Sequence, residues 1–579
     1  MLYSLSDIYQ TVSGGQVLKN LKLVTHLVGA LPIVNYYLDQ LGIDELFEEA
    51  FPTSKRAEIS HAKALGALLR NIILRDRHPL YSHAEWCKNI QPSLLKMLPE
   101  QTERLNDDRI GRSLDKVFDS DRAVAMTEIV RRAIIKFKIN LKQLNNDSTT
   151  LTLSGSYEAA DGSIVRGQPS LNITYGHNKD HRPDLKQLLF ILTVSSDGAV
   201  PVHYRMMNGN TADVSTHIET WDLLRELTGN TSFLYVADCK LCSKKSLEHI
   251  AKNGGRFITI LPRNRREDKW FRNFVQFKEP LWEIAISRTS RRGESAPKDI
   301  WKVTEAELPT SEGYRVIWIW SSLKAIEDSE SRQGRIEKAH HSIGALNTRL
   351  NGKRSRIRER VKVLAEAEKI ISICGVKQWA QPSITEIFDE TYKQEKNGRP
   401  GPKTKYVKTV KSRFTVSLTI IQSAIESTSK SDGIFPLISN CKDLTPSQIL
   451  ASYKFQPQLE KRYEQLKTVQ DLTPVWLKNV TRIESLMFLY FVALLVHALM
   501  ERDLRNAMKK DGLTRIPIYP EERLCPAPTA DRIIEIFSRL QRNEIHGPSG
   551  ENQIIYPSLD SNQKLILGYL NISNEIYKK

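Results

Sequence analysis

Four polar residues near the end of the chain have types and spacings that could do chemistry. The segment YKFQPQLEKRYEQLK contains Tyr453, Gln456, Glu460 and Lys467, at spacings of 3, 4 and 7 residues. In a helix these spacings place all four side chains on one face. A carboxylate, a cation and two polar groups that face the same way suit a phosphate held by a metal ion better than a core. A solvated helix face has the same composition, so the segment alone leaves both interpretations open.

Two aspartates upstream are candidate partners for Glu460. Asp147 lies in a segment with strand-like alternation of Thr and Leu, and Asp238 ends the apolar segment TSFLYVAD. Ligands of open α/β sheets gather at strand ends, and three carboxylates there could hold two Mg²⁺ or Mn²⁺ ions for phosphoryl transfer. Each acid alone has a plainer role, as a turn residue, a helix cap or an exposed side chain. Together they favour the metal site.

The charge of the chain favours a polyanionic partner. Its 579 residues include 84 Lys and Arg against 67 Asp and Glu, a formal net charge of +17. This balance indicates nucleic acid, with a basic soluble enzyme as the alternative. Six scattered cysteines indicate a reducing compartment, and Cys239 and Cys242 lack a second pair at zinc-finger spacing. The most apolar segment, 486–500, is short for a membrane span, so we expect a buried helix there and a cytoplasmic protein that is not in a membrane.

The elements that must position the acids alternate between strand and helix. A hairpin turn is predicted at Ser196, Asp197 and Gly198, between two of the strands. The β-β-β-α-β-α order is that of a ribonuclease-H-like α/β core. The predicted elements are strands at 140–156, 186–195 and 199–206, a helix at 214–227, a strand at 231–238, a helix at 243–253 and a strand at 256–261.

Five regions follow from these patterns. We expect an α/β protein whose core is interrupted by an insertion of strands and a long helix and is preceded by a helical domain, a candidate for binding DNA ends. The regions are the helical domain at 1–138, the first part of the core at 139–262, the insertion at 263–440, core helices carrying Glu460 at 441–505 and a C-terminal helical region at 506–579.

The helical part of the insertion is strongly basic. Arg354, Arg356 and Arg358 follow one another closely within the segment 325–372. Such side chains could contact DNA phosphates without reading the base sequence. A solvated face of a coiled coil is the alternative interpretation.

With these residues placed, the chain resembles the DDE transposases of bacterial insertion sequences. Tyr453, Glu460 and Lys467 match the Tyr-x2-Arg-x3-Glu-x6-Lys signature of the insertion-sequence-four type, whereas Gln456 replaces its arginine. The contexts of the two aspartates, LNNDSTT and FLYVADCKLCS, resemble the segments that carry the first and second acids of that family. The likeness covers residues 140–500.

The resemblance implies both a fold and an activity. The fold would be ribonuclease-H-like, with a β-rich insertion between the second aspartate and the glutamate. The activity would be Mg²⁺-dependent cleavage of double-stranded DNA at the ends of an element, followed by joining to target DNA. Asp147, Asp238 and Glu460 would be the catalytic, metal-binding residues. Tyr453 and Lys467 would contact phosphates, and we expect Gln456 to do so more weakly than an arginine.

A transposase must bring two DNA ends together, so a homodimer or a larger synaptic complex is expected. Two alternatives remain open. The first is a metal nuclease on the same core that cuts DNA without joining strands. The second is a DNA-binding descendant that has lost catalysis.

Overall fold

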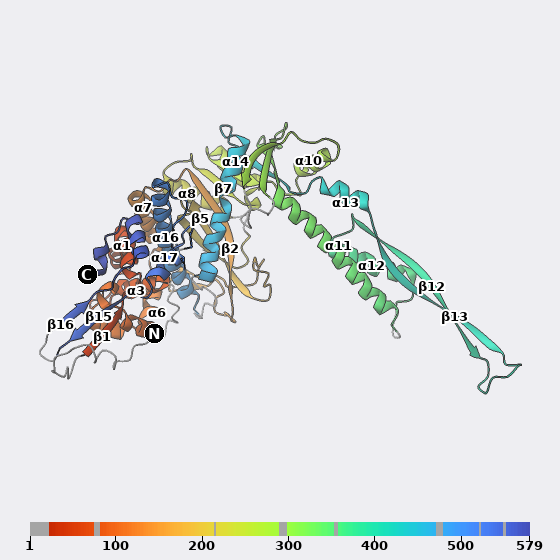
Figure 1. The fold of residues 1–579 in the computed structure, drawn as a ribbon, viewed down its shortest axis with the longest axis horizontal. Helices are drawn as coiled ribbons and strands as arrows, with labels where there is room; N and C mark the ends of the chain where they lie inside the picture. Colours follow the sequence, from red (N-terminus) through yellow and green to blue (C-terminus); the bar gives the residue numbers. More distant parts are fainter. Residues whose placement is uncertain are drawn as a thin grey trace. The chain divides into compact units, whose positions relative to one another are not determined.

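The computed structural model describes residues 22–74, 82–212, 216–288, 298–352, 357–469, 479–519, 521, 523–547 and 552–578. The chain forms two compact units (Figure 1). The first unit combines Met1–Phe257 with Lys454–Lys579, and the second is Ile258–Tyr453. In sequence, the second unit is therefore an insertion in the first.

The first unit contains strands of a large mixed sheet, in the order β6-β5-β2-β7. The central strand β2 (Gln143–Leu153) pairs antiparallel with β5 (Lys186–Ser195) and parallel with β7 (Leu234–Ala237). Antiparallel to β5 runs β6 (Pro201–Met207), and the two join through the predicted turn, where Gly198 has φ 82°. The strand β5 is buried almost throughout, which explains its continuous apolar sequence.

Helices precede and follow these strands. Between β6 and β7 lies α8 (His217–Thr228), and α9 (Lys244–Lys252) lies between β7 and β8. The short strands β3 (Ile164–Val165) and β4 (Gln168–Pro169) form a separate pair. The helices before β2 are α1 (Leu31–Leu41), α2 (Ile43–Ala50), α3 (His61–Leu74), α4 (His83–Asn89), α5 (Pro99–Arg104), α6 (Asp107–Asp119) and α7 (Arg122–Phe137).

The core of the first unit is organised around one long helix, α16 (Val480–Lys510). It packs against helices from both ends of the chain, among them α3, α6, α17 and α18. By length and composition α16 could cross a membrane, but 89% of its apolar window is buried inside the protein. That burial matches the core helix predicted at 486–500.

The ends of the described chain meet in a small sheet that the sequence does not predict. Strand β1 (Lys22–Leu27) pairs antiparallel with β15 (Gln541–His546), which pairs with β16 (Asn552–Ile555). The interpretation of 506–579 as helical is therefore wrong in part, although α17 (Ala530–Phe537) and α18 (Ser561–Tyr569) are there. The sequence QRNEIH of β15 has no apolar alternation. Its partner β1 comes from the opposite end of the chain, so no local pattern predicts this strand.

The second unit contains antiparallel strands in the order β8-β14-β11-β10-β9. Helix α10 (Arg266–Phe277) packs on them through Phe271, whose ring stacks on Trp318 with the centroids 3.8 Å apart. Trp318 thus packs in a core. The strands are β8 (Arg256–Ile260), β9 (Glu283–Arg288), β10 (Asp299–Glu305), β11 (Arg315–Ser321) and β14 (Ile434–Ser439).

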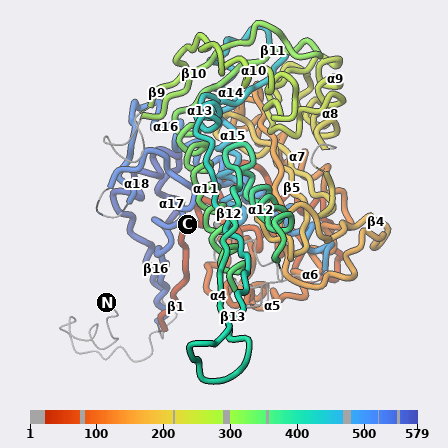
Figure 2. The backbone as a smooth tube through the Cα atoms, turned by 90° about the vertical axis from the view of Figure 1, so that its right-hand side faces the viewer, coloured from red at the N-terminus to blue at the C-terminus, as the bar shows by residue number. Residues whose placement is uncertain are grey.

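The remainder of the second unit pairs two helices with a long ribbon (Figure 2). The basic segment predicted as helical at 325–372 is split between α11 (Ser322–Leu350) and α12 (Arg360–Cys374). The ribbon consists of β12 (Ala380–Gln394) and β13 (Tyr406–Ile420), and α13 (Gln422–Ser429) follows it. The sequence does not predict β12.

Candidate active site

Strand β2 holds Asp147 in a partly buried position beside a lysine. The Asp147 side chain is 20% exposed, and its Oδ1 accepts a hydrogen bond from the Ser148 amide at 2.7 Å. The Lys179 ammonium lies 3.8 Å from Oδ1 and donates to the Ser148 carbonyl (2.6 Å) and hydroxyl (2.7 Å). The ammonium is therefore held next to the carboxylate by strand atoms.

The three predicted acids act on one another electrostatically. Burial raises the pKa of Asp147 to about 7, against the opposing charge of Lys179. The negative charges of Asp238 and Glu460 raise this pKa further. Two acids that are 91 and 313 residues away in sequence, by difference of residue numbers, thus share the surroundings of Asp147.

The sheet register explains how Asp238 comes near Asp147. Strands β2 and β7 are parallel, and Asn146 is opposite Ala237. Asp147 follows Asn146 within β2, and Asp238 follows Ala237, the last residue of β7. Asp238 also accepts a hydrogen bond from the Lys240 amide at 3.0 Å, so it caps the short turn Cys239–Leu241.

The segment that carries Glu460 is not the single helix that its spacing predicts. Helix α14 (Pro446–Tyr453) ends at Tyr453, and α15 (Gln456–Glu464) starts after two intervening residues. The break has a local cause in Pro457, which lacks an amide hydrogen and disfavours helical geometry in the residue before it, but suits the first turn of a helix. Tyr453 therefore belongs to the second unit, where its ring lies 6.4 Å from that of Phe435. Its predicted DNA contact stays a prediction.

The side chain of Gln456 is bonded to strand β2. It is only 6% exposed. Its Oε1 accepts a hydrogen bond from Asn145 Nδ2 and its Nε2 donates to the Asn146 carbonyl, both at 2.9 Å. Both polar atoms of the Gln456 amide therefore bind β2, and its predicted DNA contact stays a prediction. At the position where the signature has an arginine, Gln456 bonds α15 to the sheet.

Tyr463 is a positioning residue that the sequence analysis missed. Its hydroxyl donates to the main-chain carbonyl of Asp147. Gln456, Glu460 and Tyr463 are spaced 4 and 3 residues apart, so they share one face of α15. Glu460 lies between these two neighbours on that face, and its side chain is exposed. The spacing of these three residues is a signal that could have identified Tyr463.

Lys467 follows α15, within the π-helical turn Gln465–Val469. Its ammonium lies 2.7 Å from Asp180 Oδ1, and Asp180 Oδ2 accepts from Thr152 Oγ1 of β2 at 2.9 Å. The lysine is thus near the same strand as Asp147 but engaged with an acid. Its phosphate contact stays a prediction.

The donors of this site suit a hard cation in type and charge. All three are carboxylates, and Asp147 has a pKa raised in part by the other two, a situation that a divalent cation relieves. Their geometry is less complete. In the part of the chain that the structure describes, no group of three His, Cys, Asp or Glu side chains is close enough to hold a metal ion.

Two of the three candidate arginines cannot be assessed. Arg354 and Arg356 lie outside the described residues. Arg358 is exposed just before α12, as a contact with DNA would require. Its role stays a prediction.

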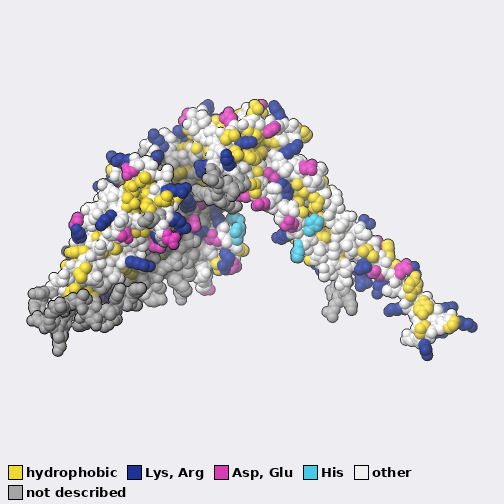
Figure 3. Space-filling view, in the orientation of Figure 1, with side chains coloured by type: hydrophobic (Ala, Val, Ile, Leu, Met, Phe, Trp, Pro, Cys, Tyr) yellow, Lys and Arg dark blue, Asp and Glu magenta, His cyan; other side chains and the backbone are white. Residues whose placement is uncertain are grey.

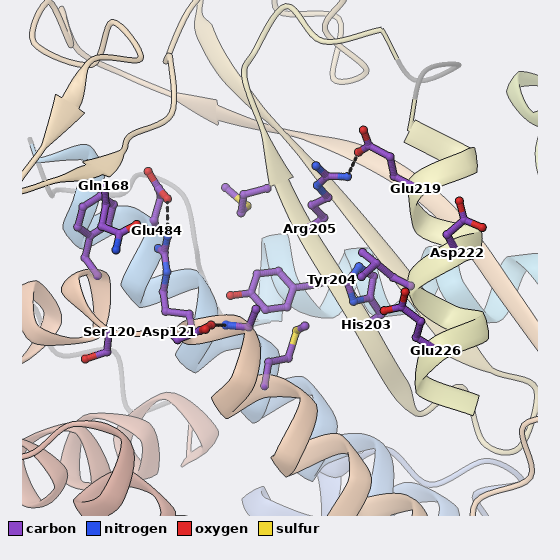
Figure 4. Close-up of a pocket in the computed structure, with 16 residues that line it drawn as sticks. Ser120, Asp121, Gln168, His203, Tyr204, Arg205, Glu219, Asp222, Glu226 and Glu484 are labelled. Carbon is purple, nitrogen blue, oxygen red and sulfur yellow. Dashed lines mark hydrogen bonds and ion pairs between the residues drawn. The ribbon is translucent and has the colours of Figure 1, made fainter. Parts of the chain in front are cut away.

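A cavity of about 810 Å³ lies elsewhere in the first unit (Figure 4). Its lining, all from described residues, comes largely from β6, α7 and α8 and does not include the three acids. Within it, Glu484 pairs with Arg122 at 3.0 Å, and burial lowers the pKa of His203 to about 4.

Comparisons with known proteins add little about function. Residues 23–131 match the model of a family described as a domain of unknown function (DUF4277). No curated protein matches the chain. Among solved structures, the chain is similar to that titled "Cryo-EM structure of piggyBac transposase synaptic complex with hairpin DNA (SNHP)". The TM-score is 0.36 and the identity 10%, over 87% of this chain and 79% of that chain. A similarity of this size carries no argument about activity.

Proposed function

We propose that the protein is a DNA transposase that cuts the ends of a mobile element and joins them to target DNA. The observation that carries the proposal is the placement of the three acids. Asp147 and Asp238 each follow one residue of the pair Asn146 and Ala237 on the parallel strands β2 and β7, and α15, which carries Glu460, is bonded to β2. The sheet order supports it, because an antiparallel β6-β5-β2 group with β7 parallel to β2 is the arrangement expected of a ribonuclease-H-like core. The resemblance to insertion-sequence-four transposases and the charge of +17 support it as well.

The three acids would hold two Mg²⁺ or Mn²⁺ ions, whose chemistry is to activate the attacking oxygen and to stabilise the leaving one. The chain's own residues set the geometry. Gln456 and Tyr463 fix α15 on β2 and so position Glu460. Lys179 places a positive charge beside Asp147, and Lys467 would exchange Asp180 for a phosphate oxygen near the cut.

The proposed reaction has two steps at phosphorus, a hydrolysis and then a transesterification. Water first attacks the phosphodiester at the element end in line, the bond to the 3′ oxygen breaks, and a 3′-OH is released. That hydroxyl then attacks a phosphodiester of the target, which loses its own 3′ oxygen. Each step is a displacement without an oxidant or a cofactor that stores energy. Two ends require at least two active sites, so we propose a dimer or a larger synaptic complex.

The test uses DNA that carries the gene's own flanking sequences, purified protein and Mg²⁺ or Mn²⁺. Glu460→Gln is compared with Glu464→Gln, which changes an exposed acid one turn further along α15. We expect Glu460→Gln to slow end cleavage by about three orders of magnitude, because several kcal/mol of transition-state stabilisation are lost. Glu464→Gln should cleave and join like the wild type.

Each other outcome points to a specific alternative. Cleavage that survives Glu460→Gln would remove the third acid and with it the proposed site. Cleavage without joined products would indicate a nuclease on the same core. DNA binding that ignores Mg²⁺, with no nicking by the wild type, would indicate the non-catalytic descendant.

A further inference from the structure

The ribbon of β12 and β13 is anchored at one end only. Its strands pair over fifteen positions, from Ala380 opposite Ile420 to Gln394 opposite Tyr406. At the base, Phe414 and Val416 are buried in a cluster with residues of α11 and α12. Asn347 of α11 also bonds both main-chain polar atoms of Val416, at 2.7 and 2.8 Å. The base is therefore part of the folded unit.

The outer half of the ribbon has no protein packed on either face. Every described residue at 388–393 and at 406–413 is exposed. Phe388 and Tyr392 are 62% and 60% exposed, and the register places them on the same face as Tyr406. Isolated two-stranded ribbons are marginally stable in water, and open edges with apolar side chains invite a partner. This half of the ribbon is thus built to contact something else.

The charge of the ribbon indicates the chemistry of that partner. Residues 391–411 include seven Lys or Arg and one acid, Glu395, a net charge of +6. Nearer the base, two further acids are paired with cations of the ribbon, Asp389 with Arg413 at 2.9 Å and Glu390 with Lys408. Figure 3 shows dark blue and yellow side chains together at the far end of the ribbon. A surface of this kind is complementary to a polyanion that also offers apolar contacts.

We propose that the outer ribbon, residues 387–413, enters the major groove of duplex DNA. A two-stranded ribbon fits that groove, and eight residues of each strand span about 26 Å, most of one helical turn. The lysines would bind phosphates on both sides, and the aromatic face would contact thymine methyl groups and sugars. A second copy of the chain, itself at +17, is a poorer partner because like charges repel. The inference rests on the proposed function for the identity of DNA as the substrate.

The experiment measures the affinity for a 30-base-pair duplex at several salt concentrations by fluorescence anisotropy. The ribbon variant replaces four lysines with glutamine: Lys393, Lys403, Lys405 and Lys411. We expect its affinity for the duplex to fall roughly 100-fold. The slope of log K against log salt should become shallower by about 3, because fewer counterions are released when fewer phosphates are contacted.

Two further variants separate charge from apolar contact. Tyr392→Ser with Tyr406→Ser should weaken binding about tenfold with an unchanged salt slope, because no phosphate contact is removed. The matched control removes four exposed lysines of the first unit, and its slope should stay closer to that of the wild type. These are Lys252, Lys509, Lys510 and Lys564.

The outcomes distinguish this inference from the proposed function. Glu460→Gln should bind DNA like the wild type, whatever its effect on cleavage. If the ribbon variant keeps its affinity and slope while the wild type cleaves DNA, the ribbon inference fails alone. If the wild type does not bind duplex DNA, both fail. Should the ribbon variant instead lose self-association in light scattering, with DNA binding unchanged, a second copy is the occupant and the inference is overturned.

Discussion

At the residue scale, the pKa of Asp147 describes the candidate site best, because it depends on the burial and the charges around this carboxyl group. Its carboxyl group is partly buried and close to two other acids, with Lys179 as the opposing charge. An ordinary aspartate would be ionised throughout the neutral range. Without a bound cation, the folded protein instead holds the proton on Asp147 up to a pH of about 7.

This property predicts how Asp147→Asn changes stability with pH. Since the folded pKa is above the unfolded value of 3.8, the contribution of Asp147 is fully present below pH 4 and is lost as pH rises through 7. In chelator, Asp147→Asn should therefore gain stability over the wild type between pH 4 and 7, up to roughly 4 kcal/mol above pH 8. Urea unfolding at pH 4, 6 and 8 measures this gain. Parallel profiles for the two proteins would show that the carboxyl is not strained.

A second prediction concerns the cation that would relieve this strain. Mg²⁺ or Mn²⁺ at 100 times its Kd should stabilise the wild type by about 2.7 kcal/mol, because it binds only the folded site. Asp238→Asn should lose most of this gain in a thermal-shift titration. Asp161→Asn, which changes an acid in the loop before β3, serves as the control and should respond like the wild type. Equal responses from all three proteins would place the cation elsewhere.

At the scale of elements, α15 shows what the residue at the arginine position of the signature, Gln456, does in the fold. The side chains of Gln456 and Tyr463 are bonded to β2, and both lie on the face that carries Glu460. Gln456, at the position that suggested a DNA contact, forms a buried bond between helix and sheet.

Substitution at Gln456 separates these two roles. Gln456→Arg restores the family residue but buries a charge against two asparagines, so we expect a loss of about 3 kcal/mol in stability and weaker end cleavage. Gln456→Ala should cost about 2 kcal/mol, because it leaves Asn145 and the Asn146 carbonyl without their partner. Urea unfolding and a cleavage assay measure both effects. An arginine variant that is stable and cleaves faster would restore the phosphate contact.

The sequence predicted the elements that carry local signals and missed those that depend on distant partners. Strand β5 is predicted with its observed bounds, because ten mostly apolar residues lie between clear turns. Strand β12 was missed because its outer half is exposed on both faces and has no apolar alternation. The acids could be proposed from their contexts, whereas Tyr463 and the burial of Gln456 depend on how α15 meets β2. Pro457 is a local signal in the sequence for the break before α15.

At the scale of the whole molecule, the first unit is held together by segments from far apart in the chain. A buried ion pair joins Arg462, just after Glu460, to Glu501 of α16 at 2.8 Å, with both side chains 4% exposed. Glu501 also accepts from Gln465 and from the Ala530 amide, each at 3.0 Å. One carboxylate thus links the segment that carries the third acid, the central helix and the start of α17.

This network around Glu501 predicts that the stability of the first unit falls in acid. Burial alone would raise the pKa of Glu501, but Arg462 and Arg505 outweigh it, so the pKa is below its ordinary value. The stabilisation is therefore present above pH 4.5 and is lost as pH falls below it.

Glu501→Gln should cost about 3–5 kcal/mol at pH 7, because it leaves Arg462 buried without a counter-charge. Arg462→Met combined with Glu501→Leu should recover much of that loss, since neither charge remains. Urea unfolding of the three proteins at pH 7 and 4 tests this, and a double variant as unstable as Glu501→Gln would mean that packing, rather than the unpaired arginine, sets the cost.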